Sequence, residues 1–175
     1  AGVPCVCHIR HSERPNWFDR KLAEAVGAFI YISESVQRSH LEAGVPCGKG
    51  RVVYNGLNIS DFVGPLDVSL GRRSFHLTDH DLAVGIVGRL ERWKGHEILF
   101  RAMAQIVEAV PDAKGVVVGD SVPHEPHYGD ELRALRDELG LADRILFSGF
   151  RPDIPTVMSA LDVVVLASVA PEPFG

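Results

Sequence analysis

The 175-residue sequence has no apolar run long enough to cross a membrane, and no secretory signal pattern opens it. It also has no excess of positive charge, because 18 Lys and Arg face 23 Asp and Glu, a net charge of −5 that argues against a nucleic-acid-binding surface. Cysteines are few, namely Cys5, Cys7 and Cys47, and their spacing does not fit a ribbon-type zinc site. We therefore expect reduced cysteines in a cytoplasmic protein.

Motifs of several common enzyme classes are missing as well. The sequence contains no Walker-type glycine loop, no Gly-x-Ser-x-Gly elbow and no complete Gly-x-Gly-x-x-Gly, which weakens kinase, hydrolase and dehydrogenase interpretations. The pairs His76/His80 and His124/His127 have spacings that a metal could use, but neither has an acidic or Cys partner at a matching spacing. Solvated loops are therefore favoured there, and we predict that the protein needs neither a metal nor a cofactor.

What the sequence does contain is an alternation of short apolar runs with segments of helical periodicity. This alternation predicts an α/β fold with doubly wound, Rossmann-like parallel sheets. The expected strands are 3–9, 28–33, 51–58 (broken at Asn55-Gly56), 82–88, 114–119, 144–150 and 162–168. The expected helices are 16–27, 33–44, a segment from about Lys94-Gly95 to Pro111, 130–140 and 153–161. Residues 62–81 show no clear pattern.

Asn55-Gly56 is a strong turn signal and predicts a domain boundary near residues 55–62. Residues 1–60 contain too few strands for a full nucleotide-binding half, so we interpret them as the end of one α/β domain with its linker. Residues 61–175 are interpreted as most of a second. The sequence begins without Met and stops at "PEPFG", and we expect both ends to be cut.

The four strands after Leu82 are expected in the order 3-2-1-4, because right-handed crossovers favour that arrangement. The first and fourth strands would then be neighbours, and ligands of open α/β sheets bind at the carboxyl ends of such a pair. The loops predicted to meet there are "GRLERWKG" (88–95) and "SVAPEPFG" (168–175).

Gly88, Arg89 and Lys94 suit a diphosphate. Gly88 allows close approach to the main chain, Arg89 offers a fork of donors, and Lys94 adds a compact charge beside a helix N-terminus. An ordinary loop with solvated cations is the alternative.

Glu172 lies between two prolines and could accept hydrogen bonds from sugar hydroxyls, or simply pair with Arg89 or Lys94. The amides of Phe174 and Gly175 precede the next expected helix, where they could reach a phosphate. His8 follows the first strand and could face a cleft, although a lone His more often has a structural role.

Together the stretches "VGRLERWKG", "VVVGD", "LGLADRILFSGF", "DIPTVMSALDVVVLAS" and "PEPFG" resemble the carboxyl-terminal half of retaining GT-B glycosyltransferases. The family is the large glycogen-synthase-like, bacterial cell-envelope group, glycosyltransferase family 4. The leading "HLEAGVPCGKGRVVYNGLNISDF" is similar to its run from the last helix of the amino-terminal domain into the linker. The resemblance thus implies a GT-B fragment, with the end of the amino-terminal, acceptor-side domain followed by most of the nucleotide-sugar-binding domain.

The resemblance also implies roles for individual residues. Arg89 and Lys94 match the pair that holds the donor diphosphate, and Glu172 matches the first acid of a Glu-x7-Glu motif that contacts the sugar. Phe174 and Gly175 match a loop whose amides reach the sugar or phosphate. His8 matches a cleft-facing His near the donor sugar, and 149–151 (Gly149, Phe150, Arg151) match the nucleobase pocket. The second Glu of the motif and the family's glycine loop are absent, so we expect this chain to be inactive alone.

The expected activity is metal-independent, retaining hexosyl transfer from a UDP-, GDP- or ADP-linked sugar to a glycan, lipid-linked or small-molecule acceptor. It would serve bacterial polysaccharide or cell-envelope synthesis in the cytoplasm. The sequence leaves open a peripheral association of the whole enzyme with the cytoplasmic face of the membrane. A nucleotide-sugar epimerase of the same fold and a non-catalytic nucleotide-sugar-binding module are the alternatives. An uncovered apolar strand at 162–168 is expected to promote self-association.

Overall fold

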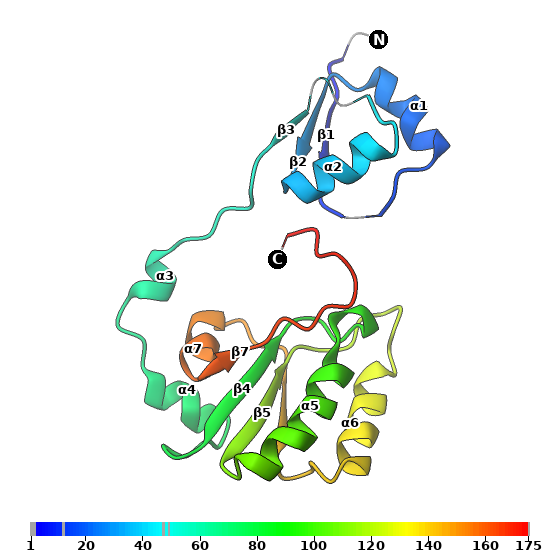
Figure 1. Ribbon diagram of the computed structural model, residues 1–175. Coiled ribbons are helices and arrows are strands. Elements are labelled where there is room, and N and C mark those ends of the chain that lie inside the picture. The colour runs from blue at the N-terminus through cyan, green and yellow to red at the C-terminus, as the bar shows by residue number, and fades with distance from the viewer. Residues whose placement is uncertain (1–2, 12, 47, 49, 175) are drawn as a thin grey trace. The chain divides into compact units, whose positions relative to one another are not determined.

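The computed structural model describes residues 3–11, 13–46, 48 and 50–174 (Figure 1). Contacts divide the chain into two compact units: unit 1 is Ala1–Leu57 with Pro171–Gly175, and unit 2 is Asn58–Ala170. The chain passes from unit 1 to unit 2 inside the predicted 55–62 region, whereas nothing in the sequence predicts that the last five residues group with unit 1. Within the described ranges, no helix is long and apolar enough to span a bilayer.

Unit 1 contains a three-stranded parallel sheet in the order β1-β2-β3. Its elements are β1 (Val6–Ile9), α1 (Trp17–Ala25), β2 (Ala28–Tyr31), α2 (Glu34–Glu42) and β3 (Gly50–Val52). Both helices begin at side-chain caps, since Asn16 forms a capping box with Asp19 and Ser33 accepts from the Val36 N–H. The strand–helix alternation predicted for this region is confirmed.

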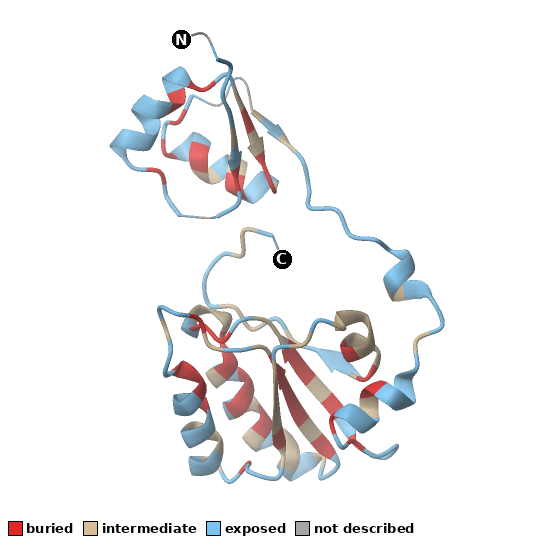
Figure 2. Cartoon of the chain, turned by 180° about the vertical axis from the view of Figure 1, so that it is seen from behind, coloured by how far each residue is buried: buried red, intermediate tan, exposed pale blue. Residues whose placement is uncertain are grey.

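The sheet of unit 1 packs through one of its faces. Ile9, Phe29 and Tyr31 are buried in one core cluster with residues of α1 and α2. Alternation along β1 turns Val6 and His8 to the opposite face, where both are exposed. In Figure 2, buried positions accordingly alternate with less buried ones along β2, and β3 has none.

Unit 2 contains a four-stranded parallel sheet in the order β6-β5-β4-β7, which confirms the predicted 3-2-1-4 arrangement. Its strands are β4 (Leu82–Val87), β5 (Ala113–Val118), β6 (Ile145–Gly149) and β7 (Val163–Val164). Its helices are α3 (Ser60–Val63), α4 (Val68–Ser74), the 3-10 turn η1 (Arg92–Lys94), α5 (His96–Ala109), α6 (Tyr128–Glu138) and α7 (Ile154–Ser159).

Helices cover both faces of this second sheet (Figure 1). Val117 of β5 packs with residues of α5 and α6, such as Phe100 and Leu132, whereas its neighbours Val116 and Val118 belong to a cluster with α7. A strand that is buried on both faces has a continuous run of apolar residues, which is why the strands of unit 2 can be recognised in the sequence.

Two features of unit 2 differ from the sequence-based expectation. The unassigned stretch 62–81 contains α4, which packs on α7 so closely that a Cβ at Gly71 would lie 2.7 Å from the Thr156 carbonyl oxygen. The expected strand 162–168 is wrong in length: β7 is Val163–Val164, and the flanking Asp162 and Val165 N–H groups donate to Ala83 and Gly85 of β4.

The end of the sheet at β7 exposes apolar surface, as expected. Val163, Val164 and Leu166 are 51%, 50% and 66% exposed. Self-association through this surface stays a prediction: light scattering should show a mass that rises with concentration, and a constant monomer mass would contradict it.

Candidate functional site

A cavity of about 400 Å³ opens at the carboxyl ends of β4, β5 and β6. The three βα loops supply its walls, and because parallel strands end at the same edge, residues distant in sequence meet there. Its lining is Val87, Gly88, Arg89, Val118, Gly119, Asp120, Ser121, Val122, Pro123, Phe150, Arg151 and Ile154. Four residues predicted to bind a ligand, Gly88, Arg89, Phe150 and Arg151, therefore share one cavity.

Two glycines let the loops at this edge pack main chain against main chain. A Cβ at Gly119 (φ +139°) would lie 1.9 Å from the Gly88 carbonyl oxygen, and one at Gly95 (φ +74°) would lie 2.0 Å from the Ala167 carbonyl oxygen. The Val169 N–H also donates to the Trp93 carbonyl at 2.8 Å. The loop after β4 thus lies against the segment after β7, as the strand order predicts.

Arg89 and Lys94 are linked through Glu91 and Trp93, two of the four residues between them. Arg89 Nη2 lies 3.0 Å from Glu91 Oε2, which also accepts from Trp93 Nε1 at 3.1 Å. Lys94 Nζ lies 4.1 Å from the centroid of the Trp93 ring. The predicted cation pair is therefore part of one connected cluster at the sheet edge.

Gly88 leaves main chain accessible near these cations, whereas Gly95 is buried at the start of α5. A Cβ on Gly88 would meet no atom within 4 Å, so the space beside it is open. Gly95 is the N-cap of the 14-residue helix α5 and supplies no capping side chain. The positive end of the α5 dipole consequently lies at the same edge as Lys94.

The segment after β6 is shaped by a carboxylate that the sequence did not single out. Asp120 Oδ2 accepts from the Phe150 N–H at 3.0 Å, and Gly149 adopts the left-handed region at φ +70°. The Phe150 side chain is 72% exposed. Asp120 thereby fixes the turn that presents an aromatic ring at the cavity.

Arg151 lines the cavity, but the N–H groups of its guanidinium contact other side chains of unit 2. Nε and Nη2 contact the two carboxylate oxygens of Asp153 at 2.7 and 2.6 Å, and Nη1 donates to Ser74 Oγ at 3.1 Å. The Asp153 hydrogen bond raises the pKa of Arg151 and lowers that of Asp153. Arg151 therefore contributes its aliphatic stem to the cavity wall, and its charge is already paired.

His96, the first residue of α5, lies completely buried against Tyr128. Neither of its ring nitrogens makes a hydrogen bond of standard geometry within the described ranges. Burial, with help from the charge of Lys94, lowers the pKa of His96 to about 4, although the Glu91 main chain opposes the shift. Burial likewise raises the pKa of Tyr128 to about 12. Both side chains are thus neutral beside the cation cluster at physiological pH.

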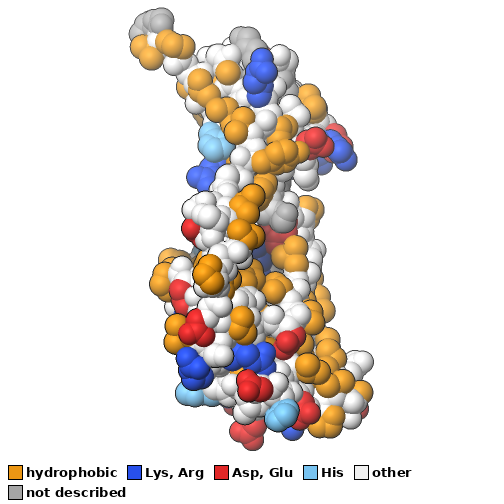
Figure 3. Space-filling model, turned by 90° about the vertical axis from the view of Figure 1, so that its left-hand side faces the viewer, with side chains coloured by type: hydrophobic (Ala, Val, Ile, Leu, Met, Phe, Trp, Pro, Cys, Tyr) orange, Lys and Arg blue, Asp and Glu red, His pale blue; other side chains and the backbone are white. Residues whose placement is uncertain are grey.

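His124 is not simply solvated, as its sequence context suggested, because its Nε2 lies 3.0 Å from Glu91 Oε1. The described residues contain no group of three or more His, Cys, Asp or Glu side chains that could hold a metal ion. In the view of Figure 3, Lys and Arg side chains lie among Asp and Glu rather than in one broad patch.

The remaining predicted site residues belong to unit 1 or lie outside the described residues. Glu172 and Phe174 group with unit 1, where the Phe174 ring lies 6.2 Å from that of Tyr54. Gly175 lies outside the described residues. The pairing of Glu172 with the cations stays a prediction, as does the role of His8 on the exposed face of β1.

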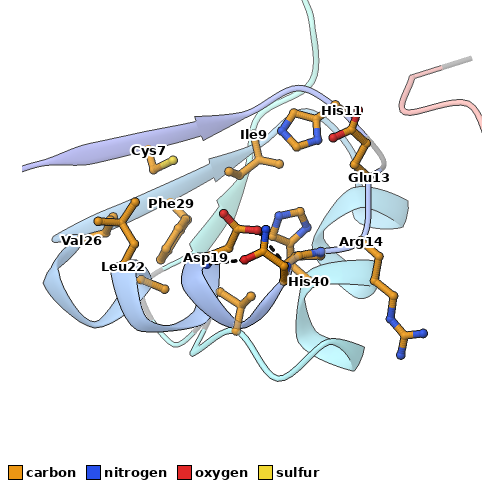
Figure 4. Close-up of a pocket in the computed structure, with 14 residues that line it drawn as sticks. Cys7, Ile9, His11, Glu13, Arg14, Asp19, Leu22, Val26, Phe29 and His40 are labelled. Atoms are coloured by element: carbon orange, nitrogen blue, oxygen red, sulfur yellow. Dashed lines mark hydrogen bonds between the residues drawn. The ribbon is translucent and has the colours of Figure 1, made fainter.

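Unit 1 has a cavity of its own, of about 390 Å³, between α1 and the sheet (Figure 4). Core residues such as Ile9, Ala23 and Phe29 form its apolar part, and His11 and Arg14 lie near its mouth. Its lining does not include His8. Trp17, Phe18 and Leu22 of α1 are exposed.

The chain was compared with known proteins by sequence. Residues 71–175 match the family model described as glycosyl transferases group 1. The chain is 35% identical over 156 residues to an uncharacterized glycosyltransferase of Methanocaldococcus jannaschii, covering 83% of this chain and 37% of that protein. It is 28% identical over 185 residues to the UDP-Gal:α-D-GlcNAc-diphosphoundecaprenol α-1,3-galactosyltransferase of Escherichia coli, covering 97% and 47%. It therefore spans less than half the length of these relatives.

Solved structures agree with this relationship. Anabaena HepE in complex with UDP-glucose superposes with a TM-score of 0.87 at 33% identity, over 98% of this chain and 49% of that one. Sucrose-phosphate synthase of Thermosynechococcus elongatus gives a TM-score of 0.71 at 30% identity, over 90% and 38%. The fold is thus a fragment of the GT-B architecture. With its family model matched over more than half of its length, the chain belongs to the glycosyl transferases group 1 family.

Proposed function

We propose that the whole protein transfers a hexose from a nucleoside-diphosphate sugar to an acceptor hydroxyl, with retention at the anomeric carbon. One observation carries this proposal: Arg89 and Lys94 belong to one cluster in the loop after β4, and Arg89 lines the 400 Å³ cavity at the carboxyl ends of β4, β5 and β6. Ligands of open α/β sheets bind at such an edge.

The cations would act on the leaving group. As the bond between sugar and phosphate breaks, negative charge grows on the diphosphate. Arg89, Lys94 and the N-terminus of α5 would stabilise that charge, at about 3 kcal/mol for a well-placed donor. Because the protein supplies these positive charges itself, we propose that the transfer needs no metal ion.

The cavity suits the nucleoside part of the donor. Most of its lining is apolar side chain or main chain, and Phe150 presents an exposed ring beside the cavity. A base could stack on that ring while the diphosphate extends toward Arg89. The proposed donor is a UDP-sugar, which is supported by the complex of the related HepE with UDP-glucose.

The proposal also gives roles to Glu172 and His8. Glu172 would accept hydrogen bonds from the transferred sugar, and His8 would contact the donor sugar. Retention would follow if the acceptor attacks from the face that the diphosphate leaves, with a phosphate oxygen taking the acceptor's proton.

The proposed role is in cell-envelope glycan synthesis. The names of two relatives support it: the E. coli galactosyltransferase above, and a lipopolysaccharide core biosynthesis mannosyltransferase of Rhizobium meliloti that is 30% identical over 114 residues. A lipid-linked acceptor would also bring the whole enzyme to the cytoplasmic face of the membrane.

Calorimetric titration of this chain with UDP, GDP and ADP tests the donor class, and UDP is expected to bind most tightly. The whole protein, incubated with UDP-glucose and with lipid-linked or soluble glycan acceptors, should give an α-linked product by NMR. A product that forms without acceptor, and differs only in the sugar's configuration, would instead indicate an epimerase. Binding without any product would indicate a nucleotide-sugar-binding module.

A further inference from the structure

The loop between β4 and α5 contains a buried carboxylate whose role the proposed chemistry leaves open. The Glu91 side chain is only 4% exposed. A buried carboxylate is costly unless several donors compensate it. Glu91 has three: Arg89 Nη2, Trp93 Nε1 and His124 Nε2, at 3.0 to 3.1 Å.

The contact with Arg89 restricts the guanidinium without covering it. One nitrogen lies against Glu91 Oε2, while the Arg89 side chain remains 63% exposed. A guanidinium has five N–H donors in a fixed plane, so a contact at one nitrogen restricts the orientation of the others. Arg89 also lines the cavity.

Trp93 extends the same restraint to the second cation. Its indole N–H is held by the oxygen that also contacts Arg89, which fixes the orientation of the ring. Lys94 Nζ lies 4.1 Å from the centroid of that ring. A cation near an aromatic face is attracted to it, so the orientation of the ring biases the position of the ammonium group.

The other carboxylate oxygen joins a second loop to the cluster. Glu91 Oε1 contacts His124, which follows Pro123 in the cavity wall. Next to this contact, the Arg92 main-chain N–H donates to Glu125 Oε2 at 3.1 Å. The loops after β4 and β5 are therefore joined by two adjacent pairs of residues.

We infer that Glu91 is a positioning residue for the donor diphosphate: it orients Arg89 directly and Lys94 through Trp93, without touching the ligand itself. This inference rests on the proposed function, because it assigns the purpose of the orientation to diphosphate binding. The negative charge of Glu91 would not by itself lead to this inference. A carboxylate beside a diphosphate site repels the ligand, so simple electrostatics predicts tighter binding when the charge is removed.

The two accounts predict opposite results for Glu91→Gln. The amide keeps the shape of the side chain but replaces one acceptor oxygen by a donor, which must then face Arg89, Trp93 or His124. Positioning predicts that UDP binds about tenfold more weakly, a loss comparable to that of one hydrogen bond to a charged group. Uridine, which has no phosphate, should bind as it does to the wild type.

The experiment titrates uridine and UDP into the wild-type chain, Glu91→Gln, Trp93→Phe and the control His127→Ala, an exposed residue of the same loop as His124. Trp93→Phe keeps a ring for Lys94 but loses the N–H, so UDP affinity should fall about two- to threefold. It also keeps the test decisive if Glu91→Gln does not fold. In parallel, ¹⁵N relaxation of the Arg89 Nε–H group measures its order without any ligand.

Weaker UDP binding with unchanged uridine binding, and lower order of Arg89 Nε in Glu91→Gln, would support the inference. Unchanged or tighter UDP binding would overturn it, and so would an equal loss of uridine binding, which would indicate a general structural role. If the wild type binds neither compound, the proposed function loses its support. The relaxation data then decide the positioning alone: lower order of Arg89 Nε supports it, and unchanged order overturns it.

Discussion

The two units contain cavities of nearly equal volume, about 400 Å³ in unit 2 and 390 Å³ in unit 1, but different structural elements line the two cavities. In unit 2 the walls are βα loops at the ends of parallel strands, with open main chain at Gly88 and the guanidinium of Arg89. In unit 1 the cavity lies between α1 and the face of the sheet, and its apolar part belongs to the unit's own core.

Volume alone therefore does not identify a site. The cavity of unit 1 is lined by core side chains together with polar and charged ones such as Glu13, Arg14 and Asp19. A cavity at a sheet edge joins several loops, helix N-termini and fixed cations, which are the groups that an anionic ligand requires. On this comparison we expect ligand effects from changes in unit 2 and stability effects from changes around the cavity of unit 1.

The largest expected effect is on Arg89. Arg89→Ala should weaken UDP binding by about 100-fold, because it removes a charge-assisted contact to the diphosphate. In the whole protein it should lower turnover by a similar or larger factor. The matched control is Arg14→Ala beside the cavity of unit 1, and calorimetry measures both. Equal losses from the two variants would abolish the distinction between the cavities.

The next effect concerns acid stability. His96 has its pKa lowered to about 4 by burial, against an ordinary 6.5, so it stabilises the fold fully above pH 6.5 and progressively less as the pH falls toward 4. The loss across that interval is about 3 kcal/mol. His96→Leu should flatten the pH dependence of urea unfolding, and the exposed control His127→Leu should leave it unchanged. A wild-type free energy of unfolding that is constant from pH 7 to 4 would contradict the burial of a neutral imidazole.

A methyl group at Gly88 should affect binding and not folding. The added Cβ meets no atom within 4 Å, so Gly88→Ala should leave the unfolding free energy within about 0.5 kcal/mol of the wild type. UDP affinity should nevertheless fall about tenfold, since the methyl occupies space beside the accessible main chain. Gly56→Ala in unit 1, where a Cβ also meets open space, is the control. Undiminished UDP affinity would show that the ligand does not approach Gly88.

The smallest effect is expected in unit 1. Ala23→Leu would extend a buried side chain into the cavity beside α1 and should raise stability by about 1 kcal/mol through added apolar burial. UDP affinity should stay the same. Denaturant unfolding provides the measurement, and a loss of UDP binding in this variant would indicate that the cavity of unit 1 is a ligand site.

The sequence predicted the sheet of unit 2 well because β4, β5 and β6 are buried on both faces and read as apolar runs. Helix α4 could not be predicted in this way. It is short, and it is held by packing of Gly71 against Thr156, a contact between distant segments that no local pattern records. β7 was predicted too long, because an apolar run does not fix the extent of hydrogen bonding to a neighbouring strand.

The residues of the site likewise divide into those that the local sequence predicts and those whose contacts depend on the fold. Arg89 and Lys94 were predictable, since a cation after a strand at the switch point has a defined place in the fold. Glu91, Asp120 and His124 were not, because their contacts depend on which loops meet in space. An acid in a polar loop is normally solvated. The only available signal was that Glu91 stands two residues from each of Arg89 and Trp93, within reach of both.

Residue-resolved NMR during titration with UDP tests the central claim most directly. Amide shifts should change at Gly88, Arg89, Lys94 and Phe150, and the Arg89 Nε–H signal should move with them. Residues around the cavity of unit 1, such as Phe29 and His40, should stay constant. Shift changes confined to unit 1, or spread evenly over the chain, would contradict the assignment of the sheet edge of unit 2 as the diphosphate site.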